Sequence, residues 1–132
     1  MSRIHRGIED NPQISVIVSV YNQEKYIGRC LRSLLYQKIN TYLYEIIVVN
    51  DGSTDKTDYA LEQFSGNESR IKVFKNDENK GLPASLNLAI NKSLGNYVVR
   101  VDSDDFVNAN FLNFLYIYLE SNKDTDAVAC DY

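Results

Sequence analysis

The feature that most constrains this fold is the alternation of short apolar runs with segments whose apolar residues recur at helical spacing. The first run, Ile14 to Val20 (ISVIVSV), is rich in β-branched residues, and the second is Glu45 to Val49 (EIIVV). Strands covered on both faces have nearly continuous apolar sequences, whereas strands with one solvated face alternate. These two runs therefore predict buried strands of a parallel sheet.

The rest of the chain continues the alternation. Apolar residues spaced three and four apart predict helices near residues 27–35, 59–64, 86–94 and 111–119. Further strands are predicted at Ile71 to Phe74, at Tyr97 to Val101 (YVVRV, with one Arg as an exception) and at Ala127 to Cys130. Single helices between strands imply right-handed crossovers. The predicted fold class is a three-layer α/β/α sandwich with a mostly parallel sheet.

Three residues mark the expected helix ends. Asn22 is placed to cap the first helix, and Pro83 suits the first turn of the third. Gly95 is placed to end that third helix. We assign residues 1–12 to a leader and 13–132 to one domain, because 132 residues are a single domain's worth.

Charge and composition exclude several classes of protein. The net charge is -4, and Lys and Arg do not cluster strongly, so we expect no nucleic-acid partner. The leader lacks the apolar core of a signal peptide, and no apolar stretch approaches the roughly 20 residues of a membrane span. We therefore expect a cytoplasmic protein. Any association with the cytoplasmic face of a membrane would come from sequence outside this chain.

Cysteine usage does not indicate a metal or disulfide framework. Cys30 and Cys130 are far apart and form no CxxC pair, and the only histidine, His5, lies in the leader. A structural zinc site needs about four clustered ligands. We expect two buried, reduced thiols.

Polar residues follow each predicted strand. The first strand leads into Tyr21 and Asn22, the second into Asp51, the third into Asn76, and the fourth into Asp102-Ser103-Asp104. Ligands of open α/β sheets bind outside the carboxyl ends of the strands. The sequence thus predicts a binding site at that edge of the sheet.

The two carboxylates of Asp102 and Asp104 suit a hard divalent cation. Mg²⁺ and Mn²⁺ prefer oxygen ligands, and one or two carboxylates with phosphates and water are a common arrangement. Each feature also has a simpler interpretation: the aspartates can cap the following helix, Asp51-Gly52-Ser53-Thr54 can be a plain turn, and Tyr21 can be a partly buried aromatic. Only their joint placement favours a site.

Other phosphate-binding folds lack their signatures here. The turn after the first strand has no glycine before Gly28, which excludes G-x-G-x-x-G at that point, and neither a P-loop nor a G-x-S-x-G elbow occurs. A cradle of backbone N–H groups is therefore not expected, and a metal would have to hold the anion.

The ordered motifs resemble a known family. "SVYNQEKYI", "VVNDGSTD", "NKGLPASLNLAI" and "RVDSDD" together closely resemble the inverting family 2 glycosyltransferases, which have the Rossmann-like GT-A nucleotide-sugar-binding fold. The resemblance covers residue 14 to about residue 132, and the pair "VVNDGSTD" and "VDSDD" is its most specific part.

The resemblance implies a role for each matching residue. Tyr21 would lie against the base, with Ser19 and Asn22 in the same pocket, and Asp51 would accept a hydrogen bond from uracil N3–H. Asp102 would sit near the ribose and the metal, and Asp104 would coordinate Mn²⁺ or Mg²⁺ at the diphosphate. The implied nucleotide-sugar-binding set is Ser19, Tyr21, Asn22, Asp51, Asn76, Asp102 and Ser103. Asn76 stands where some relatives carry an Arg that contacts the nucleotide, and Asp105 is a weaker candidate near the metal.

The implied chemistry is metal-dependent transfer from a nucleotide-diphospho-sugar, UDP-sugar by expectation, to an acceptor hydroxyl with inversion. The acceptor, whether glycan, lipid-linked or protein, is not specified, and a cell-surface polysaccharide and another glycan are both open as products. No motif supplies the general base, which we expect beyond residue 132, although Asp131 lies near the family's acceptor side. A non-catalytic nucleotide-sugar-binding module is the alternative. A nucleotidyltransferase would usually have a Gly-rich basic loop after the first strand, and residues 21–28 lack one.

Overall fold

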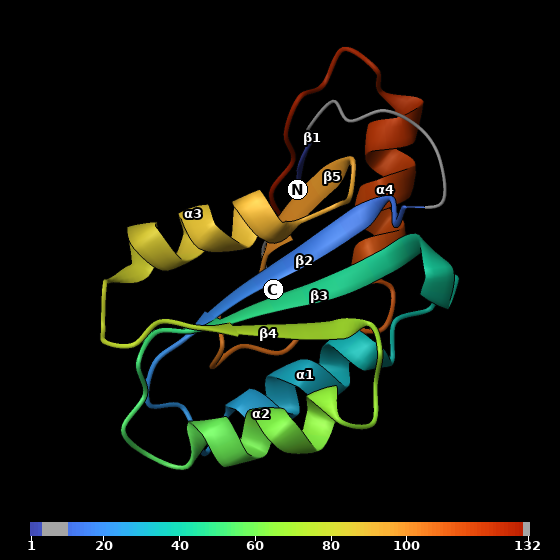
Figure 1. Cartoon of the computed structure of the whole chain (residues 1–132). Coiled ribbons are helices and arrows are strands. Elements are labelled where there is room, and N and C mark those ends of the chain that lie inside the picture. Colours follow the sequence, from blue (N-terminus) through green and yellow to red (C-terminus); the bar gives the residue numbers. More distant parts are fainter. Residues whose placement is uncertain (4–10, 131–132) are drawn as a thin grey trace.

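A computed structural model describes residues 1–3 and 11–130, and its centre is a five-stranded sheet in the order β1-β5-β2-β3-β4 (Figure 1). The strands are β1 (Ser2–Arg3), β2 (Ile14–Val20), β3 (Tyr44–Asn50), β4 (Ile71–Lys75) and β5 (Tyr97–Arg100). Strand β2 pairs in parallel with both β3 and β5, and β4 pairs in parallel with β3. Only β1 is antiparallel, at the edge beside β5.

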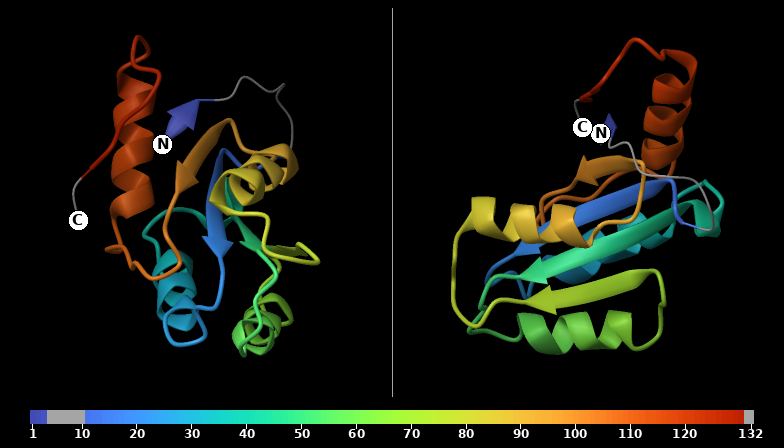
Figure 2. Two further views of the ribbon diagram at one scale, coloured as in Figure 1. Left: turned by 90° about the vertical axis from the view of Figure 1, so that its left-hand side faces the viewer. Right: turned by 45° about the horizontal axis from the view of Figure 1, so that its top comes forward.

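Helices cover both faces of this sheet. They are α1 (Ile27–Leu35), α2 (Thr57–Ser65), α3 (Leu82–Lys92) and α4 (Phe111–Ser121), and a 3-10 turn, η1 (Thr41–Leu43), precedes β3. Helix α3 packs on one face against β2 and β3, and apolar side chains of α1, α2 and α4 pack on the other. Figure 2 shows α4 at the β5 end of the sheet and α2 at the opposite end. The predicted three-layer sandwich with a mostly parallel sheet is confirmed.

The continuous apolar runs are explained by burial on two faces. In β2, Val16 and Val18 belong to the larger core under α1, α2 and α4, whereas Ile17 belongs to the smaller core under α3. In β3, Ile46 and Ile47 divide between the two cores in the same way. Each strand therefore buries successive side chains in different layers, which removes the polar alternation of a half-exposed strand.

The ends of the chain differ from the prediction. Residues 127–130 do not form a strand, because only Ala127 makes an isolated bridge, to Ser2. Residues 2 and 3, which we had placed in the leader, form β1 instead and occupy the sheet edge beside β5. The Met1 ammonium donates to the Val128 carbonyl at 2.8 Å, so the two ends of the chain meet there.

Two expected helix ends and one expected burial were also wrong. Helix α1 begins at Ile27 with Tyr26 at its N-cap, so Asn22 does not cap it. Helix α3 ends at Lys92, and Ser93, not Gly95, is its C-cap. Cys30 is buried as expected, but Cys130 is exposed.

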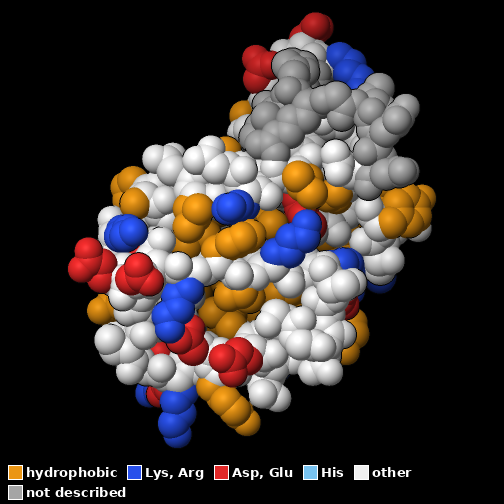
Figure 3. All heavy atoms as spheres, in the orientation of Figure 1, with side chains coloured by type: hydrophobic (Ala, Val, Ile, Leu, Met, Phe, Trp, Pro, Cys, Tyr) orange, Lys and Arg blue, Asp and Glu red, His pale blue; other side chains and the backbone are white. Residues whose placement is uncertain are grey.

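Charged and apolar side chains are interspersed over the surface in Figure 3, where hydrophobic groups form separate patches between Lys, Arg, Asp and Glu. Within the described residues, no helix combines the length and the apolar character that crossing a membrane requires.

A buried carboxylate holds the turn before β5 against the sheet. Glu45 is only 3 % exposed and accepts hydrogen bonds from the Ser15 hydroxyl (2.6 Å), the Lys72 ammonium (2.7 Å) and the Leu94 N–H (2.7 Å). The Ser15 hydroxyl in turn accepts from the Gly95 N–H at 2.8 Å. Every polar group in this contact is thereby paired, which is the condition for burying it without a large penalty.

Gly95 is required by close approach. A Cβ there would lie 2.6 Å from the Ser15 nitrogen and 2.7 Å from the Ile14 carbonyl carbon, both of which are backbone atoms of β2. Neither atom can move without disturbing the central strand. The role of Gly95 is therefore to let the turn touch the sheet.

We predict that Gly95→Ala lowers the free energy of unfolding by about 2 kcal/mol or more, as overpacking of a well-filled interior does. Gly28→Ala is the matched control, because its new Cβ would meet side chains alone, the end of Arg32 at 3.4 Å and the Phe64 ring at 3.7 Å. Alanine also favours helix there by up to about 1 kcal/mol. Urea unfolding of the three proteins checks this, and equal midpoints would contradict the close approach.

Candidate functional site

The sheet ladder continues for one residue past the carboxyl ends of its strands. The Asp51 N–H donates to the Val20 carbonyl (2.8 Å), and the Asn76 N–H donates to the Asn50 carbonyl (2.9 Å). On the other side of β2, the Val101 N–H donates to the Ile17 carbonyl at 3.1 Å. The loops after all four parallel strands therefore begin at one edge of the sheet, the edge at which the sequence places its polar residues.

Asp51 lies at the centre of this edge and is 2 % exposed. Its Oδ1 accepts from the Asn76 side-chain amide (2.8 Å) and the Lys80 N–H (2.9 Å), and its Oδ2 accepts from the Gly81 N–H (2.9 Å). The Asn76 amide also reaches the Ser85 hydroxyl at 3.2 Å, at the start of α3. One carboxylate thus joins the end of β3, the end of β4 and the loop that enters α3.

The hydrogen bonds keep Asp51 ionised. Burial by itself would raise the pKa of this carboxyl group. The Lys80 N–H, the Asn76 amide, the Gly81 N–H and the Ser85 hydroxyl outweigh burial and lower the pKa below its ordinary value. Asp51 therefore carries a full negative charge at neutral pH.

Gly52 allows the two loops to touch. Its φ is +71°, in the left-handed region, and a Cβ would lie 2.5 Å from the Glu78 carbonyl carbon. A side chain there would be strained by the backbone conformation and would also collide with the neighbouring loop.

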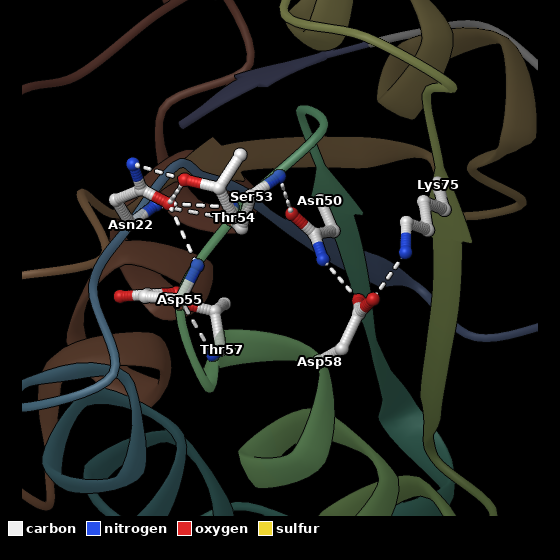
Figure 4. Close-up of polar contacts among 8 residues, drawn as sticks. All are labelled: Asn22, Asn50, Ser53, Thr54, Asp55, Thr57, Asp58 and Lys75. Carbon is white, nitrogen blue, oxygen red and sulfur yellow. Dashed lines mark hydrogen bonds and ion pairs between the residues drawn. The ribbon is translucent and has the colours of Figure 1, made fainter.

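Reciprocal hydrogen bonds join the loop after β2 to the loop after β3 (Figure 4). Asn22, at φ +51°, accepts through its Oδ1 from the backbone N–H groups of Thr54 (2.8 Å) and Asp55 (3.3 Å). In the other direction, the Asn22 N–H donates to the Ser53 hydroxyl at 3.0 Å. The side chain that we expected to line a nucleotide pocket is thus engaged in holding two loops together.

The same junction extends further along both loops. The Gln23 N–H donates to the Thr57 hydroxyl (3.0 Å), and the Glu24 N–H donates to the Asp55 carboxylate (3.2 Å). The Lys56 N–H donates back to the Glu24 carboxylate at 2.9 Å. Of these N–H groups, only that of Lys56 lies at the start of α2, at its N-cap, where the helix itself provides no acceptor, and the Glu24 carboxylate satisfies it.

A second polar chain lies beside it. Asp58, in the first turn of α2, accepts from the Asn50 side-chain amide and pairs with the Lys75 ammonium (Figure 4). The Asn50 side-chain oxygen accepts from the Ser53 N–H at 3.1 Å. Three elements, β3, β4 and α2, are thereby tied together next to Asp51.

Two predicted pocket residues remain accessible near these loops. Tyr21 is 45 % exposed, so its ring is available to a planar ligand. Ser19 is half-buried on β2, two residues before it. Asn76, by contrast, is 7 % exposed, and its amide is occupied by Asp51 and Ser85.

The acidic motif follows β5. Asp102 and Asp104 are both exposed at the carboxyl edge, whereas Ser103 between them is buried and only 7 % exposed. The Asp102 Oδ1 accepts two hydrogen bonds from the Arg100 guanidinium, from Nε at 2.9 Å and from Nη2 at 2.6 Å. No hydrogen bond or ion pair to the Asp104 carboxylate occurs among the described residues.

The backbone of this motif rests on α1. The Cys30 thiol donates to the Asp102 carbonyl (3.5 Å), and the Arg29 guanidinium donates to the Asp104 carbonyl (3.3 Å). Burial, and then the charges of Asp105, Asp104 and Asp102, raise the pKa of the Cys30 thiol to about 12. The thiol therefore stays protonated and serves as a donor, not as a nucleophile.

A cavity of about 450 Å³ opens beside the motif. Its lining comes from α1, from the motif and the segment after it, from the start of α4 and from the residues after α4, and consists of Arg29, Asp104, Asp105, Phe106, Val107, Asn108, Phe111 and Cys130. The Arg29 guanidinium lies 4.5 Å from the centre of the Phe106 ring, which is 57 % exposed. This cavity joins an apolar wall to the acidic motif.

The donor set fits a hard divalent cation that brings other ligands with it. Among residues 1–3 and 11–130, no three His, Cys, Asp or Glu side chains converge on one point. The exposed carboxylates of Asp102 and Asp104 are nevertheless the oxygen donors that Mg²⁺ and Mn²⁺ use together with phosphates and water. Asp131 lies outside the described residues.

Sequence reasoning missed two contributors to this edge. Arg100 was visible only as the single charge in an otherwise apolar strand, two residues before Asp102. Since alternate residues of a strand share a face, that spacing was the available signal. The backbone N–H groups of Lys80 and Gly81 carried no signal, because main-chain donors are the same at every residue except proline.

Comparisons with known proteins agree with this geometry. The model of "Glycosyl transferase family 2" matches residues 15–131. An uncharacterized glycosyltransferase of Haemophilus influenzae is 39 % identical over 121 residues, which cover 92 % of this chain and 37 % of that relative. The chain thus spans little more than a third of that curated relative's length.

Solved structures of two proteins share the fold of this chain. The structure of S. aureus TarS 1-349 in complex with UDP-GlcNAc has a TM-score of 0.79 and 36 % identity, covering 84 % of this chain and 32 % of that one. The mannosyltransferase PcManGT from Pyrobaculum calidifontis, in complex with GDP-Man and Mn²⁺, has a TM-score of 0.77 and 27 % identity, covering 83 % and 32 %.

We predict that Asp51→Asn lowers the free energy of unfolding at pH 7 by about 2 kcal/mol, because two backbone N–H groups lose a charged acceptor. The pKa of Asp51 is lower in the folded protein than in the unfolded chain. Its contribution is therefore complete above the unfolded pKa, near 4, and is lost as the pH falls through the folded pKa.

Urea unfolding between pH 7 and pH 3 checks this prediction. The difference between parent and Asp51→Asn should shrink as the solution is acidified below about pH 4. Asp77→Asn, which removes an exposed carboxylate from the neighbouring loop, is the control and should match the parent within about 0.5 kcal/mol. A pH-independent difference at Asp51 would contradict the assigned hydrogen bonds.

Proposed function

The chain belongs to glycosyl transferase family 2, and we propose that it binds the donor in the transfer of a sugar from a nucleotide-diphospho-sugar to an acceptor hydroxyl. The observation that carries the proposal is the convergence of Tyr21, Asp51 and the Asp102-Ser103-Asp104 motif at one edge of a parallel sheet. This is where open α/β sheets bind ligands.

The base and the diphosphate would occupy different parts of this edge. The exposed ring of Tyr21 offers a face on which a nucleobase can stack. Asp51 lies nearby, because its N–H donates to the carbonyl of Val20, the residue before Tyr21. We assign the Asp51 carboxylate as the acceptor for a base N–H, such as N3–H of uracil. Because Asp51 also fixes Asn76, Lys80 and Gly81, it shapes the pocket wall as well.

Ser19 and Asn22 contribute on the β2 side of the pocket. We assign Ser19 to a direct contact, since it is half-buried beside Tyr21. Asn22 acts through the loops that it joins, because its side-chain oxygen is held by Thr54 and Asp55. Asn76 acts in the same indirect way through Asp51.

The acidic motif is assigned to the sugar and diphosphate. Asp104 and Asp102 would hold Mn²⁺ or Mg²⁺, which would supply Lewis-acid stabilisation of the departing diphosphate. We also assign Asp102 to the ribose, and Ser103, which is buried between the two aspartates, to the wall of the same site. The cavity that Arg29 and Phe106 line next to Asp104 is the space we assign to the sugar.

Transfer would proceed with inversion, by attack of the acceptor hydroxyl on the face opposite the diphosphate. Such a step needs a general base within hydrogen-bond reach of that hydroxyl. We assign none among the described residues. The proposal for residues 1–132 is therefore donor binding, and turnover requires the base.

A uridine nucleotide is the donor we favour. Support comes from TarS, whose structure contains UDP-GlcNAc at 36 % identity to this chain. The structure of PcManGT, at 27 % identity, contains GDP-Man and Mn²⁺. GDP is therefore the nucleotide to compare with UDP in binding experiments.

The proposal is tested by titrating UDP into the chain by calorimetry, first with Mn²⁺ and then with a chelator. We predict that Asp104→Ala weakens UDP affinity in Mn²⁺ by about tenfold or more, as loss of metal support does. Uridine affinity should not change, because uridine has no phosphate. Circular dichroism confirms that the variant is folded.

Asp124→Ala is the matched control, since it removes the same charge from an exposed position after α4. It should bind UDP like the parent. Equal UDP affinity in Asp104→Ala and the parent would overturn the metal assignment. Binding of GDP in preference to UDP would overturn the choice of uridine, and binding without transfer by a chain that carries the base would favour a non-catalytic module.

A further inference from the structure

Arg100 is the one residue of β5 that is not buried. It pairs in register with Ile17, so its side chain shares the α3 face of the sheet with Ile17 and Val98. Asp102, two residues further on, receives both the Nε and the Nη2 hydrogen bonds of Arg100 on a single oxygen, Oδ1. The Arg100 guanidinium is therefore bound directly to the first aspartate of the acidic motif.

The local charges explain why the pair forms. Asp102, Asp104 and Asp105 place three carboxylates within four residues. In the described part of the chain, Arg100 is the only cationic side chain that pairs with any of them. Arg29 is nearby, but it donates to the Asp104 carbonyl and lies over the Phe106 ring. Arg100 is therefore the counter-ion of this motif.

The ion pair between Arg100 and Asp102 can be replaced by other partners of each side chain. The Arg100 and Asp102 side chains are 47 % and 49 % exposed, so water screens their attraction. Exposed ion pairs contribute little to stability, and a doubly charged cation competes well for the same carboxylate. A guanidinium that leaves Asp102 keeps the fork of N–H donors that matches phosphate oxygens.

We propose that Arg100 is a diphosphate-binding residue of the donor site, which the Asp102 carboxylate holds in place until the donor arrives. This inference rests on the proposed function, since it names a further residue for the same donor. In the nucleotide-free protein, Arg100 opposes cation binding at Asp102. With the donor present, the guanidinium transfers to the diphosphate and adds to its affinity.

The two roles of Arg100 change affinity in opposite directions: it weakens the binding of Mn²⁺ alone and strengthens the binding of the diphosphate. Separate titrations can therefore distinguish them. We predict that Arg100→Met binds Mn²⁺ alone roughly threefold more tightly than the parent, because a neighbouring positive charge is removed. The same variant should bind UDP in Mn²⁺ about tenfold more weakly, the loss expected for a charge-assisted hydrogen bond. Uridine affinity should be unchanged.

The experiment measures free Mn²⁺ by electron paramagnetic resonance and nucleotide binding by calorimetry, on the full chain. Arg32→Met is the matched control, because it removes the same charge from α1, where Arg32 lies 6.0 Å from the centre of the Phe64 ring. The control should resemble the parent in all three titrations. Arg100→Lys keeps the charge but lacks the paired N–H donors of the guanidinium. Its Mn²⁺ affinity should therefore equal that of the parent, below that of Arg100→Met, and its UDP affinity should lie between those of Arg100→Met and the parent.

Other outcomes are decisive as well. If Arg100→Met weakens both Mn²⁺ and UDP, Arg100 only orients Asp102 and the inference is wrong. Unchanged affinities for both ligands would also overturn it. A parent chain that binds no UDP would overturn the proposed function instead, and the Mn²⁺ titration would still report whether Arg100 opposes the cation.

Discussion

The site depends on the hydrogen-bond ladder that β2 shares with the strands on both of its sides. Because Val20 pairs with Asn50, and Asn50 with Lys75, strands β2, β3 and β4 end in one row. The ladder then extends by one further bond at Asp51 and at Asn76. A slip of one residue would turn every side chain to the other face of the sheet. The apolar runs on both faces of β2 and β3 therefore determine where the polar residues lie.

Asp51 joins this row of strand ends to the loop that enters α3. Its carboxylate accepts hydrogen bonds both from Asn76 at the end of β4 and from the loop before α3. Gly52 permits the close contact of the two loops, and Asn22 joins the remaining loop from β2. The residues of "SVYNQEKYI" and "VVNDGSTD" thus support one another through hydrogen bonds that form within the protein.

Much of this arrangement could be predicted from the sequence. Strands buried on two faces leave a strong signal, so Ile14 to Val20 and Glu45 to Val49 were identified as buried strands of a parallel sheet, although their partners were not. The position of Asn22 could not be predicted, because a residue that precedes a helix and one that bridges to another loop look alike in a local pattern. The same limit explains Gly95: a glycine near a helix end suggests a C-cap, whereas here it is required by a neighbouring strand that is distant in sequence.

The edge at β5 was the least predictable part. Ala127 to Cys130 has the composition of a strand, but the two residues of β1 pair with β5, and composition carries no information about which segment pairs at an edge. Arg100 is the exception in an apolar run, and its contact with Asp102 is a feature of the folded structure that the run itself does not indicate. Pairwise contacts of charged groups depend on three-dimensional position, which periodicity alone does not give.

The junction between the loops after β2 and β3 has a thermodynamic consequence for recognition. When loops become ordered only as a ligand binds, the conformational entropy that they lose lowers the affinity for that ligand. Here the bonds from Asn22 to Thr54 and Asp55, and those between Glu24 and Lys56, form on folding. That ordering cost therefore falls on the folding equilibrium, and a ligand that bound at these loops would not bear it. Preorganisation of this kind raises the affinity of any site that such loops form.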